Sequence, residues 1–458
     1  MLVSTVLVAP TFGAPAGDGE DASRYPDEPQ PLLLDQFPDR PAPLLELGAP
    51  FLDTGTLDPG IELPTGAVWQ PSLMVFGTYR SAFQTFHDGR SETTFTEWAN
   101  RLDLFANLQL SGTERILVGM RPLDRGTRFS GYYFNPDEAD INEGWHGELN
   151  AEITTLFFEG DFGEIFPNID PDDSVPLDFG FSIGRQPLFY QEGILINDTI
   201  DAIGVTKNNI FPKGFSNLQL TFLYGWAEIN RDDNDRKANQ HLFGFFTEAD
   251  LGGSTLNLDM VYVYDASGRE RNQSSFHWGA SAVQRIGYVN TSFRAFGSYT
   301  ADEDTAAASE GHLLFGEISW IPFGTKDNMY INGFVGFDEF SSAARAEDTG
   351  GPLGRTGILF AAVGIGRYGA PLGNSADDSW GAAIGYQKFF GTFKRTQIVV
   401  EAGLRDGLSD DEPFSAALGA SFQQALGQRT VFRVDTFIAG GEEREPSYGA
   451  RAEILVQF

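Results

Sequence analysis

The chain has 458 residues, a formal net charge of −33 and no cysteine. So acidic a balance argues against nucleic acid as a partner, because phosphate binding needs a basic surface. No stretch reaches the roughly 18 consecutive apolar residues of a transmembrane helix, so the sequence offers none. Alternating segments are instead punctuated by Gly, Asn and Asp, which is typical of an all-β fold.

The first 66 residues differ in composition from the rest. Residues 1–16 form an apolar run that ends in Ala14-Pro15-Ala16, so we predict the remnant of a secretory signal peptide, although its basic start is missing. Residues 17–66 are rich in Pro and acidic residues. Because Pro fixes φ and removes a donor, we predict a periplasmic arm without regular strands or helices. This arm is either a linker or a contact for a periplasmic partner.

Alternation begins near residue 70. In RLDLFANLQLSGTERILVGMRPL, the residues at 102, 104, 106, 108 and 110 are apolar, and those between them run from Arg101 to Gln109. A tight turn follows, and apolar residues at 116, 118 and 120 then oppose Arg115 and Arg121. The pattern predicts a β-hairpin, whose first strand has the roughly ten residues that a tilted strand needs to cross a membrane.

Similar strands recur to the end of the chain. Short turns, such as 251–254 and 426–428, alternate with longer polar loops, such as 122–147 and 441–447. This alternation is the rule for bacterial outer-membrane barrels, with short periplasmic turns and long extracellular loops. Counting strands from the two ends of the chain places residues 339 and 380 on the same side of the membrane. Residues 340–379 must therefore form one loop, with the apolar run 356–366 folded inward or against the wall. We therefore predict a transmembrane antiparallel β-barrel over 70–458 with about 18 strands, within a range of 16 to 20.

The chain ends on Phe458, with apolar residues at alternate positions before it and Tyr448 ten residues earlier. This ending is the usual targeting signal of outer-membrane barrels, so we predict that the barrel-assembly machinery reads Tyr448 and Phe458. Localisation in the outer membrane of a Gram-negative bacterium follows, with membrane lipid and lipopolysaccharide as neighbours.

A barrel of roughly 16 to 18 strands leaves an aqueous channel. Most acidic residues fall in the arm and loops, whereas the predicted lumen positions alternate Arg with carboxylates. The predicted pore-lining arginines are Arg101, Arg115, Arg185, Arg285, Arg294, Arg405, Arg433 and Arg451. Such a lumen could pass an anionic or hydroxyl-rich solute. Alternatively, ion pairs with Asp103, Asp435 or Glu453 only stiffen the wall.

The stretch GRQPLFYQEGILINDTIDAIGV (184–205) resembles a segment of the alginate-export family of outer-membrane porins. The matching residues are Gly184, Arg185, Gln186, Glu192, Gly193, Asp198 and Asp201. The resemblance implies an 18-stranded barrel, a periplasmic gate loop and export or diffusion of an anionic polysaccharide. It also implies a solute site at Arg185, Asp198 and Asp201. The strong acidity and the Pro-rich arm depart from that family.

Other classes of function remain open. No G-x-S-x-G motif is present and the five histidines are scattered, so we predict no enzyme, no cofactor and no metal site. The acidic stretches 170–173 and 231–237 lack the spacing of a dedicated calcium loop. A general or sugar porin, or a barrel that sheathes a partner protein, are the alternatives to a channel for a polar, anionic carbohydrate.

Overall fold

The structure is a computed structural model, and it describes residues 41–48, 60–89, 94–135, 142–169, 177–236, 239–268, 270–302, 305–391, 393–409, 413–442 and 444–458. The chain divides into two compact units, Met1–Pro41 and Ala42–Phe458, and the strands and helices of the described residues all lie in the second. The expected signal remnant and much of the predicted arm lie outside the described residues.

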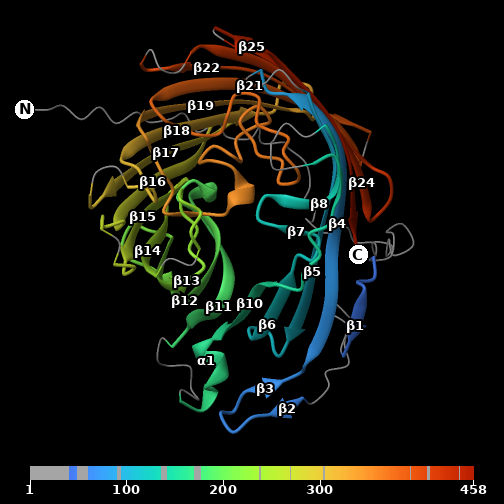
Figure 1. Ribbon diagram of the computed structural model, residues 1–458. Helices are drawn as coiled ribbons and strands as arrows, with labels where there is room; N and C mark the ends of the chain where they lie inside the picture. Colours follow the sequence, from blue (N-terminus) through green and yellow to red (C-terminus); the bar gives the residue numbers. More distant parts are fainter. Residues whose placement is uncertain are drawn as a thin grey trace, which may run out of the picture. The chain divides into compact units, whose positions relative to one another are not determined.

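Eighteen antiparallel strands close into one barrel within the described residues (Figure 1). They are β4 (Ser72–His87), β5 (Phe95–Gln109), β6 (Arg115–Met120), β10 (Ile153–Asp161), β11 (Phe179–Tyr190), β12 (Ile196–Ile210), β13 (Asn217–Ala227), β14 (Gln240–Leu251), β15 (Ser254–Asp265), β16 (Ser275–Ile286), β17 (Val289–Thr300), β18 (Gly311–Trp320), β19 (Asn328–Asp338), β21 (Ser379–Phe390), β22 (Thr396–Gly407), β23 (Ser415–Ala425), β24 (Thr430–Gly441) and β25 (Arg444–Gln457). The predicted fold is confirmed.

The first and last strands close the barrel. β25 pairs with β4 from Tyr448 opposite His87 to Gln457 opposite Thr78. Phe458 extends the seam, because its carbonyl accepts from the backbone N–H of Gly77 at 2.8 Å and its own N–H donates back at 3.1 Å. The C-terminal residue therefore completes the ring of hydrogen bonds.

Side chains alternate across the wall as the sequence pattern predicts. On β15, Leu258, Met260 and Tyr262 are exposed, whereas Asp259 and Val261 between them are buried. Apolar exposed side chains recur on all sides of the barrel, which suits a surface that faces hydrocarbon. None of the helices in the described residues is long and apolar enough to cross a membrane.

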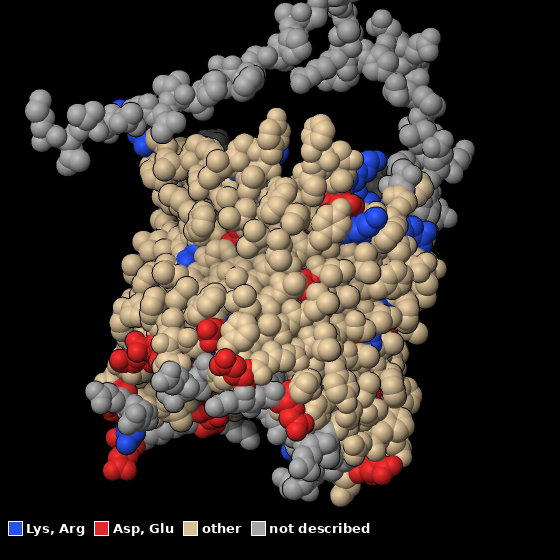
Figure 2. All heavy atoms as spheres, turned by 90° about the horizontal axis from the view of Figure 1, so that it is seen from above, with Lys and Arg blue, Asp and Glu red and all other residues tan. Residues whose placement is uncertain are grey.

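Charge differs between the two ends of the barrel (Figure 2). The picture shows acidic side chains gathered at one end and basic side chains at the other. At or beside the short turns lie five lysines, Lys207, Lys213, Lys326, Lys388 and Lys394. The short-turn rim therefore carries basic side chains, although the β10–β11 connection at the same rim also holds the carboxylates of Asp161, Glu164 and Asp178.

Three loop predictions need correction. The expected loop 441–447 is instead mostly strand, because β24 reaches Gly441 and β25 begins at Arg444. The loop after β6 holds three short strands, β7 (Asp124–Arg125), β8 (Arg128–Asn135) and β9 (Gly144–His146). Within 17–66, β1 (Leu45–Leu47) pairs with β4, and β2 (Ile61–Glu62) pairs with β3 (Val68–Trp69). These pieces contain no Pro, so their N–H groups remain free to pair.

Two segments fold into the barrel. The first is the plug loop, residues 339–378, which contains β20 (Ala344–Arg345) and η4 (Glu347–Thr349) and is seen in orange inside the ring of strands in Figure 1. The second is the inner hairpin, residues 187–200, where β11 and β12 meet at η3 (Gln191–Gly193). Both contribute to one core, in which Leu195, Ile196, Leu353 and Leu359 are fully buried. The prediction that 356–366 folds inward or against the wall is confirmed, because Ile358 and Leu359 bond Glu401 of β22.

Candidate functional site

The plug loop and the inner hairpin form a single body. β20 pairs in parallel with the start of β12, with Ile196 opposite Ala344. The N–H of Ala343 donates to the carbonyl of Leu195 at 2.9 Å, and that of Ala346 donates to the carbonyl of Asn197 at 2.9 Å. The two segments are therefore joined by backbone hydrogen bonds, independent of side-chain identity.

Arg345 reinforces this junction. Its Nη2 donates to the carbonyls of Gly193 and Ile194, the latter at 3.3 Å, and to Ser342 Oγ at 2.9 Å. The hydroxyl of Ser342 donates to the carbonyl of Ile194 at 2.7 Å. Burial lowers the pKa of Arg345 to about 10, so the guanidinium stays charged at neutral pH and keeps its donors.

Buried carboxylates of the wall hold the plug loop. Glu401 on β22 accepts from the backbone N–H of Ile358 at 3.2 Å and of Leu359 at 3.0 Å, and from the hydroxyl of Tyr330. Glu97 on β5 accepts from the N–H of Arg367 at 2.6 Å. Both glutamates are 1% exposed or less. Hydrogen bonds to charged groups are strong, so these carboxylates fix the loop at two separate points of the wall.

Arginines of β4 and β5, and Arg121 directly after β6, bind the same loop. Arg101 Nη1 donates to the carbonyl of Gly364 at 2.8 Å and to Asp348 Oδ2 at 2.9 Å. Arg121 donates to Asp348 Oδ2 at 3.0 Å, and Arg80 donates to the carbonyl of Val363 at 2.9 Å. Burial acts to raise the pKa of Asp348, but Arg121 and Arg101 outweigh it and hold this pKa below its ordinary value.

Ion pairs neutralise most of the arginines on the lumen face. Arg433 bonds Asp435 at 3.1 Å, Arg115 bonds Glu159 at 2.5 Å and Arg294 bonds Glu317 at 2.8 Å. The remaining members of this network are Arg80 with Glu453 at 2.5 Å, Arg101 with Asp103 at 3.2 Å, and Arg451 with Asp435 at 2.5 Å and with Glu453. Neighbouring carboxylates therefore balance most of the positive charge that the sequence places in the lumen.

Seven of the eight predicted pore-lining arginines lie on the lumen face by register, namely Arg101, Arg115, Arg285, Arg294, Arg405, Arg433 and Arg451. Arg405 donates to the carbonyls of Leu372 and Ser375 in the plug loop, at 3.3 and 3.1 Å. Arg285, near a short turn, donates to the carbonyl of Gly287 at 3.2 Å. Whether these residues contact a solute stays a prediction.

The three residues of the solute site implied by the family resemblance, Arg185, Asp198 and Asp201, do not come together in the lumen. Arg185 does bond Asp201, at 2.8 Å, but both lie on the strand face of Ile183 and Ile203, whose exposed side chains point out of the barrel. The pore-lining prediction for Arg185 and Asp201 is wrong. Successive residues of a strand face opposite sides of the wall, so Gly184 faces the lumen and the paired Arg185 and Asp201 face outward.

Asp198 lies apart from this pair. It is 5% exposed and accepts from the backbone N–H and the side-chain amide of Asn230, at 2.8 and 2.6 Å. Burial beneath the loop that follows β13 separates its carboxylate from the open lumen. The predicted contact of Asp198 with a solute is therefore not supported by its position.

Sequence reasoning missed several residues that position the plug. Arg80 and Glu97 lie at lumen positions of β4 and β5. The period-two alternation of 72–87 and 95–109 is visible in the sequence, so extending it to these residues would have identified both. Arg345 and Asp348 belong to the plug loop, and no periodicity marks loop residues. Their partners, such as Gly193 and Arg101, are more than a hundred residues away along the chain.

Uncharged polar groups line much of the remaining lumen. A row of amides runs from Gln387 to Gln397 to Gln423, with 2.8 Å at each step. Further amides on the lumen face by register are Gln109, Gln219, Asn257, Asn290 and Asn332. An amide carries both donors and an acceptor, so this surface can exchange hydrogen bonds with water or hydroxyl groups.

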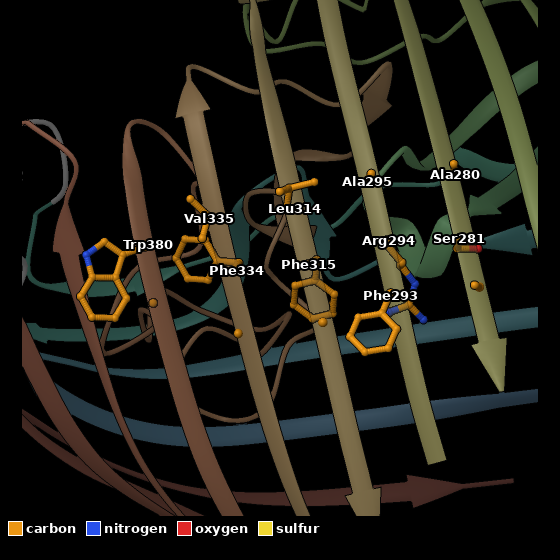
Figure 3. Close-up of a pocket in the computed structure, with 14 residues that line it drawn as sticks. Ala280, Ser281, Phe293, Arg294, Ala295, Leu314, Phe315, Phe334, Val335 and Trp380 are labelled. Carbon is orange, nitrogen blue, oxygen red and sulfur yellow. The ribbon is translucent and has the colours of Figure 1, made fainter. Parts of the chain in front are cut away.

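The cavities formed by the described residues include two polar ones and one apolar hollow. A cavity of about 470 Å³ includes Arg231, Glu339 and Arg345 in its lining, and one of about 430 Å³ lies under the inner hairpin. The hollow, about 740 Å³, follows β16 to β21 and is bordered by Phe293, Leu314 and Trp380 (Figure 3). Those three side chains are exposed on the outer face, so the hollow belongs to the surface of the barrel that faces the membrane.

The fold and the inward plug define an 18-stranded β-barrel of the kind found in bacterial outer membranes. No model of a protein family matches the chain, and no curated protein matches it.

Solved structures agree with this class. OpdK, an outer-membrane protein of Pseudomonas aeruginosa, is 11% identical, with a TM-score of 0.56, 84% of this chain covered and 98% of that one. OpdQ of the same organism is 10% identical, with a TM-score of 0.55 and coverages of 84% and 97%. Wzi of Escherichia coli, described as a carbohydrate-binding β-barrel involved in capsule assembly, is 10% identical, with a TM-score of 0.50 and coverages of 83% and 84%. At such identities the likeness shows the fold.

Proposed function

We propose that the chain is an outer-membrane channel for small, polar, hydroxyl-rich solutes, narrowed by its own plug loop and inner hairpin. The observation that carries this proposal is the chemistry of the lumen. Its arginines are bound to carboxylates or backbone carbonyls, and the surface left between them is rich in amides. A solute that brings hydroxyl groups meets partners there without breaking an ion pair.

One structural neighbour supports a solute of this kind, because Wzi is described as a carbohydrate-binding barrel. OpdK has been crystallised with vanillate, a small aromatic carboxylate, so that neighbour supports a small polar solute but not a hydroxyl-rich one. A sheath around a partner protein is a weaker candidate, because the chain's own loops occupy the interior.

Export of an anionic polysaccharide such as alginate is the alternative drawn from the sequence resemblance. It would require Arg101, Arg433 or Arg451 to exchange their present carboxylate partners for those of the solute. Each such exchange would leave a buried carboxylate without its cation, which is costly. We therefore favour solutes without a large negative charge.

Conductance of the refolded protein in a planar bilayer tests the proposal. We expect a small, steady conductance with little preference for anions over cations. A strongly anion-selective conductance would favour the polysaccharide alternative. A barrel that passes no ions under any voltage would contradict a channel of either kind.

A further inference from the structure

The cavity under the inner hairpin is built from two walls. One is the hairpin itself, through Tyr190, Gln191 and Glu192, and the other is the lumen face of β13 to β17. Its volume of about 430 Å³ falls within the range of about 300 to 1,000 Å³ that is usual for small-molecule sites. It lies in the lumen, where a solute that crosses the barrel would meet it.

Carboxylates dominate the charge of this cavity. Glu192, Glu248 and Asp259 line it together with one cation, Arg294. Arg294 already bonds Glu317 at 2.8 Å and lies 4.0 Å from Glu192. The side chain of Glu192 is 65% exposed, so it can turn toward a ligand. A negatively charged solute would be repelled here, even though the lumen as a whole is rich in Arg.

Hydrogen bonds within the protein orient other groups of the cavity before any ligand binds. Gln191 Nε2 donates to Asp259 Oδ2 at 2.7 Å, and the N–H of Thr247 donates to Asp259 Oδ1 at 3.1 Å. Ser281 Oγ donates to Asn257 Oδ1 at 3.2 Å, which leaves the amide nitrogen of Asn257 as a donor. The carboxylate and the amide are thus held in place and cost little to order when a ligand binds.

An aromatic pair forms one side of the cavity. The rings of Tyr190 and Phe246 stack with their centroids 3.4 Å apart and their planes at 10°. Both residues line the cavity, so aromatic carbon lies beside the carboxylates and amides. A ring with C–H groups on its faces and hydroxyls at its edge matches that combination of surfaces.

We infer that this cavity is a binding site for a hydroxylated ring compound of monosaccharide size that carries no negative charge, with neutral and amino sugars as the class. The inference rests on the proposed channel function for its biological meaning, but binding itself requires no transport. Glu192, Glu248 and Asp259 accept from hydroxyl or ammonium groups, Asn257 donates, and Tyr190 packs against the ring.

Ligand-observed NMR on the refolded barrel in detergent micelles tests the site without any need for conduction. The probes are methyl glucoside, glucosamine and glucuronate, which differ mainly in charge. The test variant combines Glu192→Gln with Glu248→Gln, which keeps shape and removes two negative charges. Glu159→Gln is the matched control, because Glu159 faces the lumen from β10 and does not line the cavity.

We expect methyl glucoside and glucosamine to bind and glucuronate to bind about tenfold more weakly or not at all, since a bond to a charged group is worth a factor of this order. The double variant should lose about tenfold in affinity for glucosamine, while Glu159→Gln should not. Equal binding of all three sugars, no binding of any, or an unchanged affinity in the double variant would overturn the site. A barrel that binds sugar but conducts no ions would instead refute the channel and keep the site.

Discussion

Asp348 is the residue through which the plug loop meets two arginines of the wall, Arg101 and Arg121. Its lowered pKa means that the folded state favours the ionised carboxylate. The stabilisation is therefore complete above the ordinary pKa of about 4 for an aspartate and is lost as the pH falls through the lowered folded value. Acid should release this end of the plug loop.

We predict that the conductance rises or becomes noisy as the pH falls below about 4, because protonated Asp348 no longer holds Arg101 and Arg121. Asp348→Asn should show the raised or noisy conductance already at neutral pH and respond less to acid. Glu159→Gln, which removes a lumen ion pair outside these plug contacts, should titrate like the wild type. An acid response of the same size in Asp348→Asn would mean that other groups control the plug.

At the scale of elements, the plug loop depends on backbone shape where it touches the wall. Gly366 has a φ of +63°, which L side chains rarely adopt, and an added Cβ would collide with Gln84 and Glu97. Gly369, three residues on, has open space around its Cβ position. The two glycines thus separate the effect of the contact from the effect of losing a glycine.

We predict that Gly366→Ala detaches this part of the plug loop from Glu97 and gives a larger or less steady single-channel conductance. The local cost should be about 1 to 3 kcal/mol, the range for a strained backbone. Gly369→Ala should conduct like the wild type. If both variants match the wild type, the contact around Gly366 does not close the lumen.

The strands, and the need for one loop in place of a strand at 340–379, could be predicted from the sequence, because period-two alternation is a local property and the strand ends can be counted along the chain. The ion pair between Arg433 and Asp435 follows from the same logic, since residues two apart share a face. The inner hairpin could not be predicted. Its second strand begins at Ile196 and continues into the wall as β12, and the hairpin leaves the wall only beyond Arg185, where the pairing of β11 with β10 ends.

At the scale of the whole molecule, net charge is a poor guide to the pore. The value of −33 reflects largely the arm and the loops, and Figure 2 shows acidic side chains gathered at one end. Inside, charges occur as neighbours of opposite sign, so the lumen is polar with little net field except under the inner hairpin. Passage should therefore depend on size and hydrogen bonding more than on charge.

Liposome swelling with neutral sugars of increasing size tests this account most directly. Wild-type protein should admit monosaccharides and exclude larger oligosaccharides, and a variant in which a short Gly-Ser linker replaces residues 342–376 should admit both. That difference is expected because the plug loop occupies the lumen. Equal swelling rates for the two proteins at every sugar size, or no swelling with any sugar, would contradict a plug-narrowed channel for hydroxyl-rich solutes.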